Sequence, residues 1–397
     1  MKKKMMCLVS VVAFALLAQA ASAQDVAITN ARIIVGNGTV IPSGTVIVRA
    51  GKIASVSPGA AGTQGLRVID AKGMTAVPGF IDAHRHINTG PNEKQQMQAL
   101  LEAGYTTILS GGGPADGNIT LRDHIEKGVI NGPRIIPSGR IALRGNTPDK
   151  ARADVRKLAE MGVKFTGEIA LTPVPGPSNE EIEVLKAVVD EAKKAGVFVQ
   201  VHSVSSSALV AGVDAGVRLF VHLPNKNFMS REDAKKLADT GSKILTTTGF
   251  GPPVFGVFAD DNKPRFRDGK PWPEGIVDGV RLGEEAGYAM VNARTSWDQG
   301  VVVGYCTDTT YDPLAGLNQE LKVLNVMFSM QDIIKLMGPN TASYIQMSDQ
   351  LGTLEAGKLA DITIVDGNPL DGYWNLLRTK IVLKGGKVVV DKRASAK

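Results

Sequence analysis

Cysteine is almost missing from this chain of 397 residues, because Cys7 and Cys306 are the only two. Cys7 lies in an N-terminal segment that we expect to be removed, which would leave Cys306 alone. A chain with one cysteine cannot form an intrachain disulfide, so its stability has to come from a hydrophobic core. The 43% of hydrophobic residues are sufficient for such a core in a chain of this length.

Long apolar runs are also missing, and the apolar run near the N-terminus is a short one. It follows Lys2, Lys3 and Lys4, and it ends at Ala21-Ser22-Ala23. A basic start, a short apolar stretch and an A-x-A site are typical of a secretory signal peptide, and the stretch is too short to span a membrane. We therefore expect residues 1–23 to be a signal peptide and the protein to be exported, either periplasmic or secreted. A buried N-terminal helix is the alternative.

Charge of one sign is present only in small excess. The formal net charge of the whole chain is +6, and the three lysines of the predicted signal account for half of it. No basic tract interleaved with aromatic residues is present of the kind that nucleic-acid-binding proteins use. We expect a small-molecule substrate, no nucleic-acid partner and no membrane attachment after signal removal. A homo-oligomer stays possible.

The two ends of the chain have the same texture. Residues 24–76 and 353–397 consist of short β-type runs separated by turn signals such as Gly36-Asn37-Gly38. Neither end has enough strands to be stable on its own. We therefore expect one small composite β-sandwich built from both termini.

The middle of the chain, residues 77–352, alternates predicted strands and helices. The clearest helix runs from Ser178 to Gly196, because Ser178 and Glu181 form a capping box and Gly196 ends the apolar periodicity. Eight short apolar runs, with helical patterns between them, favour a (β/α)8 TIM barrel, and a doubly wound open sheet is the alternative. The eight runs are VPGFIDAHR, GYTTILS, PRIIPSG, GVKFTGEIAL, GVFVQVHS, VRLFVHLP, KILTTTG and VVVGYCTD.

Histidine is scarce as well, with five in the whole chain, yet four of the five stand at the C-terminal ends of predicted strands. His84 and His86 are two residues apart in VPGFIDAHRH, so their side chains point to the same side of a strand. The C-terminal ends of barrel strands meet at one mouth, where nitrogen and oxygen donors suit Zn²⁺, or Fe or Mn. The six side chains expected there are His84, His86, Glu168, His202, His222 and Asp308. His124, on a predicted outer helix, is expected at the surface.

Several stretches together carry a family resemblance. VPGFIDAHRH, GYTTIL, GPRIIPSG, GYCTD and LGTLEAGKLADITIVDGNPL, with the strand-end histidines, resemble the metal-dependent amidohydrolase superfamily over nearly the whole chain after residue 23. The resemblance implies a hydrolase with one or two metal ions. It implies that His84, His86 and Asp308 hold one ion, and that His202 and His222 hold the other.

The fourth predicted strand, GVKFTGEIAL, departs from the commonest pattern of that superfamily. Many relatives end this strand with a carboxylated lysine that bridges two metals. Lys164 and Glu168 share one face of the strand, but Lys164 lies roughly 13 Å deeper by strand rise. We therefore expect Glu168 to bridge, as in the enamidase-like branch. A register shift that brings Lys164 to the site is the alternative, and a single metal is also possible.

The predicted chemistry is hydrolysis of a C–N bond in a small or cyclic amide by metal-activated water, with Asp308 as general base and then general acid. A dipeptidase or N-acyl amino acid hydrolase, a deaminase or a lactonase could use the same site. A metal-free scaffold protein without enzymatic activity is a further alternative. Arg140, after the third strand, could hold a substrate carboxylate. Phe250 and Phe255 belong to a long segment, 250–275, that we expect to wall or cover the pocket.

Two further residues have structural alternatives. Cys306 shares the inward face of Asp308, and we expect it to pack in the core because no thiolate-activating arrangement is evident. Asp82 either supports one of the histidines or makes a polar contact within the core.

Overall fold

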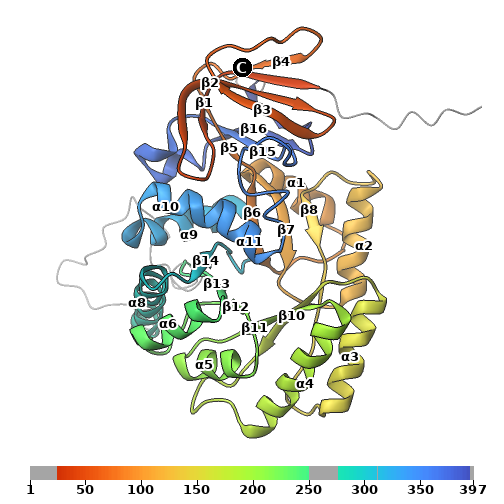
Figure 1. Cartoon of the computed structure of the whole chain (residues 1–397), viewed down its shortest axis with the longest axis vertical. Coiled ribbons are helices and arrows are strands. Elements are labelled where there is room, and N and C mark those ends of the chain that lie inside the picture. Colours follow the sequence, from red (N-terminus) through yellow and green to blue (C-terminus); the bar gives the residue numbers. More distant parts are fainter. Residues whose placement is uncertain (1–24, 250–275, 311, 394–397) are drawn as a thin grey trace, which may run out of the picture.

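The computed structural model describes residues 25–249, 276–310 and 312–393. Figure 1 shows a β-sheet at one end of the molecule, with a larger assembly of helices and strands below it. The red and orange strands of the N-terminal part lie side by side with the blue strands of the C-terminal part (Figure 1). The two ends of the chain therefore build one structural unit.

This terminal sheet has eight strands, in the order β17-β16-β15-β5-β1-β2-β3, with β4 paired to β1. The two halves of the chain meet where β15 runs antiparallel to β5, with Ile362 opposite Pro78 and Ile364 opposite Ala76. A separate cluster of buried aliphatic side chains from both halves forms its core. The strands are β1 (Val26–Ile34), β2 (Val40–Arg49), β3 (Lys52–Pro58), β4 (Arg67–Asp70), β5 (Thr75–Pro78), β15 (Ile362–Val365), β16 (Thr379–Lys384) and β17 (Lys387–Asp391).

The eight apolar runs of the middle region are confirmed as strands, all of them parallel to their neighbours. They form a three-stranded sheet β6-β7-β8 and a six-stranded sheet β14-β13-β12-β11-β10-β9. The third run is divided at Pro137, which has no N–H to donate to a neighbouring strand. The strands are β6 (Phe80–Arg85), β7 (Tyr105–Ser110), β8 (Arg134–Ile136), β9 (Ser138–Gly139), β10 (Phe165–Ala170), β11 (Phe198–His202), β12 (Leu219–Val221), β13 (Lys243–Leu245) and β14 (Val302–Gly304).

The other edges of these two sheets are connected by backbone hydrogen bonds. The Ala83 N–H donates to the Tyr305 carbonyl at 3.3 Å, and the Asp308 N–H donates to the His84 carbonyl at 2.8 Å. The first strand, β6, therefore lies beside β14 and the segment that follows it. These contacts bring residue 84 and residue 308 together although 224 positions separate them.

Helices follow most of the parallel strands and cover them on the outside (Figure 1). The predicted helix at 178–196 is confirmed as α4, with both hydrogen bonds of the Ser178–Glu181 capping box and with Gly196 in the left-handed conformation. The helices are α1 (Glu93–Ala103), α2 (Ala115–Glu126), α3 (Pro148–Glu160), α4 (Asn179–Ala195), α5 (Ser206–Asp214), α6 (Arg231–Asp239), α8 (Ile276–Asp298), α9 (Pro313–Met327), α10 (Met330–Lys335), α11 (Thr341–Tyr344), the π-helix η1 (Leu336–Asn340) and the 3-10 helices η2 (Pro369–Asp371) and η3 (Tyr373–Asn375).

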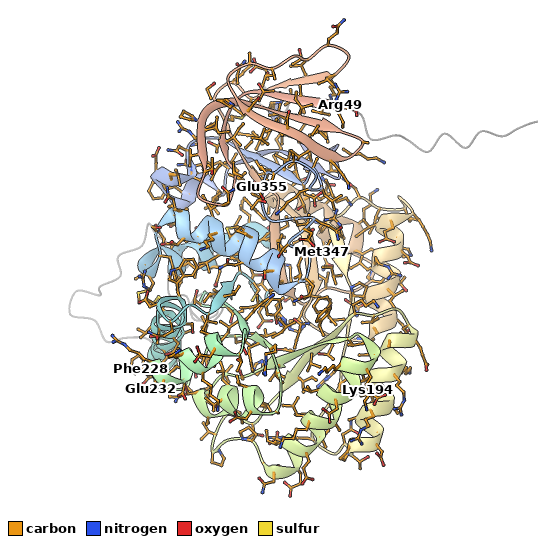
Figure 2. All side chains as sticks on the ribbon, viewed as in Figure 1. Arg49, Lys194, Phe228, Glu232, Met347 and Glu355 are labelled. Carbon is orange, nitrogen blue, oxygen red and sulfur yellow. The ribbon has the colours of Figure 1, made fainter. Side chains whose placement is uncertain are left out.

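The main core lies between the parallel strands and the helices around them. Figure 2 shows side chains filling this space, while Arg49, Lys194 and Glu232 lie at the periphery. The Arg134 guanidinium on β8 lies 2.7 Å from the buried Asp361 carboxylate, just before β15, and so joins the parallel strands to the terminal sheet. In the ranges that the structure describes, no helix has the length and apolar character needed to cross a bilayer.

Candidate metal centre

Six polar side chains converge at the C-terminal ends of the parallel strands, as the sequence predicted. Because the strands are parallel, residues at their C-terminal ends lie on one face of the assembly. The last predicted strand, VVVGYCTD, is shorter than expected, since β14 ends at Gly304 and Asp308 lies in the segment after it. The six are His84 and His86 from β6 and beyond it, Glu168 from β10, His202 from β11, His222 after β12, and Asp308 after β14.

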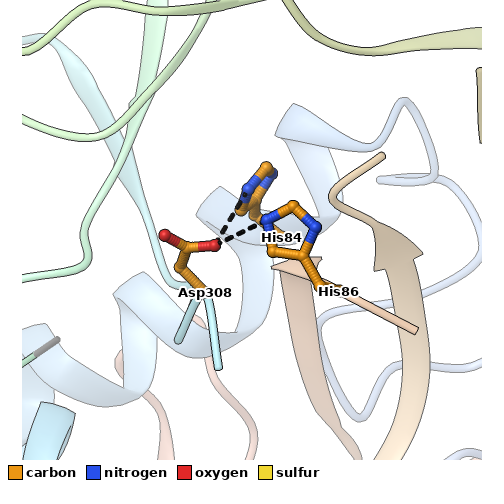
Figure 3. Close-up of side chains that lie close together, drawn as sticks. All are labelled: His84, His86 and Asp308. Atoms are coloured by element: carbon orange, nitrogen blue, oxygen red, sulfur yellow. Dashed lines mark ion pairs between the residues drawn. The ribbon is translucent and has the colours of Figure 1, made fainter. Parts of the chain in front are cut away.

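The first cluster consists of His84, His86 and Asp308 (Figure 3). Asp308 Oδ1 lies 3.3 Å from His84 Nε2 and 3.0 Å from His86 Nε2. One potential ligand atom from each residue lies within 4.8 Å of the other two. This is the trio that the family resemblance assigned to one ion.

The second cluster consists of His84, Glu168 and His222. Glu168 Oε2 lies 3.1 Å from His222 Nε2 and 3.7 Å from His84 Nε2, and Glu168 Oε1 lies 3.6 Å from His86 Nε2. His202 presents Nδ1 to Glu168 Oε2 at 2.8 Å. Glu168 therefore faces all four histidines, and its contact with His86 connects the second cluster to the first.

The donor set fits a divalent cation. Both ring nitrogens of His84, as well as Asp308 Oδ1, are buried without a hydrogen-bond partner in the described part of the chain. Buried polar atoms are normally satisfied, so atoms like these indicate a missing partner. Imidazole nitrogens and carboxylate oxygens are the ligands that zinc, iron and manganese accept.

The electrostatics favour a cation as well. Burial on its own would raise the pKa of the Glu168 carboxyl, but the nearby imidazoles of His202, His222 and His86 outweigh burial and hold that pKa well below the usual range. Burial would also raise the pKa of Asp308, but the imidazoles of His84 and His86 lower it. The nearby carboxylates of Asp308 and Glu168 raise the pKa of His86 to about 10. Burial lowers the pKa of His222, which keeps that imidazole neutral and able to act as a ligand.

Asp82 holds the backbone beneath the first cluster. Its Oδ1 accepts the N–H of His84 at 3.2 Å and that of Thr307 at 3.1 Å, and its Oδ2 accepts the Thr307 hydroxyl at 2.5 Å. Asp308, next to Thr307, has a φ of 53°, a conformation that residues other than glycine seldom adopt. Of the two roles predicted for Asp82, the structure agrees with a polar contact within the core, because this carboxylate accepts hydrogen bonds from two backbone N–H groups and the Thr307 hydroxyl.

Three contributors to the site were missed by sequence reasoning. Gly111 approaches so closely that a Cβ there would lie 2.8 Å from His84 Nε2. Thr247 Oγ1 lies 2.8 Å from His222 Nδ1, and Glu320 on α9 binds the backbone around Thr247. A charged residue inside the apolar pattern of α9 was the one sequence signal for Glu320.

The remaining predicted residues lie as follows. Lys164 is exposed and precedes β10, at the end of the strand remote from the cluster. Arg140 is exposed after β9, and its Cα would lie 3.5 Å from a Cβ placed on Gly167. His124 lies on α2 with Nδ1 2.7 Å from Glu93 Oε1. Phe250 and Phe255, with the segment 250–275, lie outside the described residues.

Cys306 is fully buried, and its thiol donates to the Thr246 carbonyl at 3.3 Å. Burial raises the pKa of this thiol well above its usual value, so it is a poor nucleophile. The structure thus agrees with a packing role. Beside the first cluster lies a cavity of about 680 Å³, bordered by His86, Gly112 and Thr310, which is large enough for a small organic molecule.

The chain was compared with known proteins. The model of the amidohydrolase family matches residues 75–247 and 277–389. An imidazolonepropionase of Caldanaerobacter subterraneus subsp. tengcongensis is 23% identical over 415 aligned positions, which cover 88% of this chain and 91% of the relative. An enamidase of Eubacterium barkeri is 27% identical over 191 positions, which cover 42% of this chain and 46% of the relative. Among solved structures, a protein of Bifidobacterium longum provisionally assigned as a prolidase is 25% identical, with a TM-score of 0.77 over 94% of this chain and 97% of that one.

Proposed function

Because the chain belongs to the amidohydrolase family, whose members are metal-dependent hydrolases, we propose that it is an exported enzyme that hydrolyses a C–N bond in a small or cyclic amide. The observation that carries the proposal is the convergence of four imidazoles and two carboxylates at the ends of parallel strands. The enamidase and imidazolonepropionase relatives support a non-peptide C–N bond as the target.

The residues that would hold one or two divalent ions are those of the two clusters together with His202. When bound, such an ion acts as a Lewis acid that lowers the pKa of water and polarises the substrate carbonyl. Zn²⁺ is our first choice because imidazole nitrogen and carboxylate oxygen are its usual ligands, and Fe and Mn are the alternatives.

Asp308 is the proposed catalytic residue. Its lowered pKa keeps the carboxylate ionised at neutral pH, so it is ready to accept a proton from the attacking water. The protonated carboxyl then donates to the leaving nitrogen as the C–N bond breaks. Asp308 Oδ1, buried between His84 and His86, is held in one orientation by its neighbours.

We also propose that β6 to β14 form one closed (β/α)8 barrel, residues 77–352, with residues 24–76 and 353–397 as a composite β-sandwich. The hydrogen bonds between β6 and the segment after β14 support closure. We keep residues 1–23 as a proposed signal peptide. Expression of the full chain in a bacterial host, followed by cell fractionation, should give an exported protein that has lost this segment, and a full-length protein in the cytoplasm would contradict export.

The test of the activity is a hydrolysis screen with the zinc- or manganese-loaded enzyme. It compares cyclic amides and imides, N-acyl amino acids, dipeptides, aminopurines and lactones, with Asp308→Asn as the matched blank. We expect turnover of cyclic amides and a loss of about 10²- to 10⁴-fold in the variant, the range for a general acid–base group. A metal-replete Asp308→Asn protein with full activity would contradict the proposed role of Asp308 in proton transfer.

A dipeptidase or N-acyl amino acid hydrolase is the second candidate, favoured by Arg140. Arg140 is exposed, and its backbone lies beside Gly167, the residue before Glu168. It is therefore available to bind a substrate carboxylate. If this candidate is right, Arg140→Gln raises KM for dipeptides and leaves cyclic amides unaffected. Deaminase and lactonase activities are further outcomes of the same screen.

A further inference from the structure

We propose that Glu320 is a positioning residue of the metal centre, which acts through Thr247 on the imidazole of His222. Glu320 comes from α9, while Thr247 and His222 follow the strands β13 and β12. The proposal rests on the metal-dependent function proposed above. It adds to that function a buried carboxylate that does not itself touch the clustered ligands.

Among the described residues, four donors converge on the Glu320 carboxylate. Oε1 accepts the N–H groups of Thr247 at 3.2 Å and Thr248 at 3.1 Å, and also the Thr248 hydroxyl at 2.9 Å. Oε2 accepts the Gly249 N–H at 2.5 Å. The residue is 1% exposed, so water cannot replace these bonds. A buried carboxylate used in this way fixes the backbone of three consecutive residues.

The backbone that it fixes is strained and tightly packed. Thr247 has a φ of 128°, a backbone conformation that is unfavourable for a β-branched residue. At Gly249 a Cβ would lie 2.7 Å from the backbone of Gln319 and Glu320, so only glycine permits this approach to α9. Such a conformation persists only where surrounding contacts determine it, and Glu320 supplies these contacts.

The strained residue is the one that faces the metal centre. Thr247 Oγ1 lies 2.8 Å from His222 Nδ1, on the side of the ring away from Glu168. A proton on Nδ1 that is donated to this hydroxyl leaves the Nε2 lone pair directed toward the second cluster. Hydrogen bonds of this kind orient metal-binding histidines, and their loss typically lowers metal affinity 10- to 100-fold.

The carboxylate is specifically required at position 320. In Glu320→Gln one oxygen becomes an NH2 group, which cannot accept the Gly249 N–H or else cannot accept the three donors at Oε1. The backbone of Thr247 is then free to leave its strained conformation, and the hydroxyl moves from His222. The same reasoning predicts that the effect of Glu320 passes entirely through the Thr247 hydroxyl.

The test measures metal binding without any substrate. Apparent Zn²⁺ affinity is measured by competition with a chelator, and the visible absorption of the Co²⁺-loaded protein reports the ligand geometry. The proteins are the wild type, Glu320→Gln, Thr247→Val, Thr247→Ser and the double variant Glu320→Gln/Thr247→Val. Glu191→Gln serves as the control, because Glu191 is another buried glutamate, paired with Arg156 on the outer helices.

We expect Glu320→Gln and Thr247→Val each to weaken metal binding about 10-fold or more and to change the Co²⁺ spectrum in the same way. Thr247→Ser keeps the hydroxyl and should retain the wild-type affinity and spectrum. The double variant should lose no more metal affinity than the single variant that loses more. Glu191→Gln should lower thermal stability alone. An unchanged spectrum and affinity in a folded Glu320→Gln protein, or fully additive losses, would overturn the proposal. A wild type that binds no metal would instead overturn the proposed function.

Discussion

At the scale of single residues, the site combines strained backbone with contacts that hold this backbone in place. Three of its residues, His222, Thr247 and Asp308, have positive φ angles without being glycine. Strained backbone of this kind collects at functional sites, where neighbouring contacts hold it in place. Asp82 and Glu320 are these contacts, and neither belongs to the two ligand clusters.

His86 makes the metal-free protein sensitive to pH. Its pKa is raised from 6.5 to about 10, so the proton that it shares with Asp308 and Glu168 stabilises the folded state fully below about pH 6.5. This contribution disappears as the pH rises toward 10. We expect the Tm of the chelator-treated protein to fall between pH 6.5 and 10, and His86→Asn to remove most of that slope.

The metal-loaded protein should behave in the opposite way over that range. A bound ion requires His86 to be neutral, so protons compete with the ion and its stabilising effect grows as the pH rises. The measurement is the difference in Tm with and without Zn²⁺ at each pH. If the Tm of the metal-free wild type and that of His86→Asn fall equally with pH, the proton is held by another residue.

At the scale of elements, two loops that supply no ligand still contact the site. The loop after β7 contributes no ligand and instead leaves room for one, because Gly111 lies against the His84 ring. The loop after β13 contributes the hydroxyl that faces His222. The ligands therefore come from strand ends and the residues just after them, while these two loops contact the rings of His84 and His222.

Gly111→Ala tests this division of roles. The added methyl group would lie 2.8 Å from His84 Nε2, so His84 has to move, and we expect at least a 10-fold loss of Zn²⁺ affinity. Gly90→Ala is the matched control, since a Cβ at that position meets no atom within 4 Å. Chelator competition measures both. Equal affinities for the two variants would mean that the ring can shift without harm.

At the scale of the whole molecule, several polar contacts join the terminal sheet to the middle region, and a buried ion pair is one of them. Asp361 accepts from Arg134 at 2.7 Å and from the Gly385 N–H at 2.7 Å, and its side chain is 3% exposed. The ion pair joins β8 of the middle region to the residue before β15, and the bond from Gly385 adds the turn between β16 and β17. It therefore connects segments from both halves of the sequence.

Asp361→Asn should leave the Arg134 charge without its partner. Removal of one member of a buried pair costs about 3–5 kcal/mol, and we place the loss near the lower limit because Arg134 is partly solvated. Urea denaturation measures the loss. The Co²⁺ spectrum should stay that of the wild type, because the pair is no part of the metal centre, and a changed spectrum would contradict this separation.

The strands, the clearest helix and the six converging side chains could be predicted from the amino-acid sequence. Strand-end histidines and carboxylates are recognisable because side chains alternate along a strand and parallel strands end on one face. The capping box of α4 is equally local, since it depends on residues three positions apart.

Which ligands share a cluster, and which residues hold them, depends on contacts between distant segments of the chain. His84 lies in both clusters, and Glu168 faces four histidines, because the packing of the two parallel sheets, with β6 beside β14, sets these distances. Glu320 reaches Thr247 across 73 positions of sequence, and no local pattern encodes that contact. Periodicity and spacing predict which face a side chain occupies, whereas contacts between distant segments depend on how helices and strands pack.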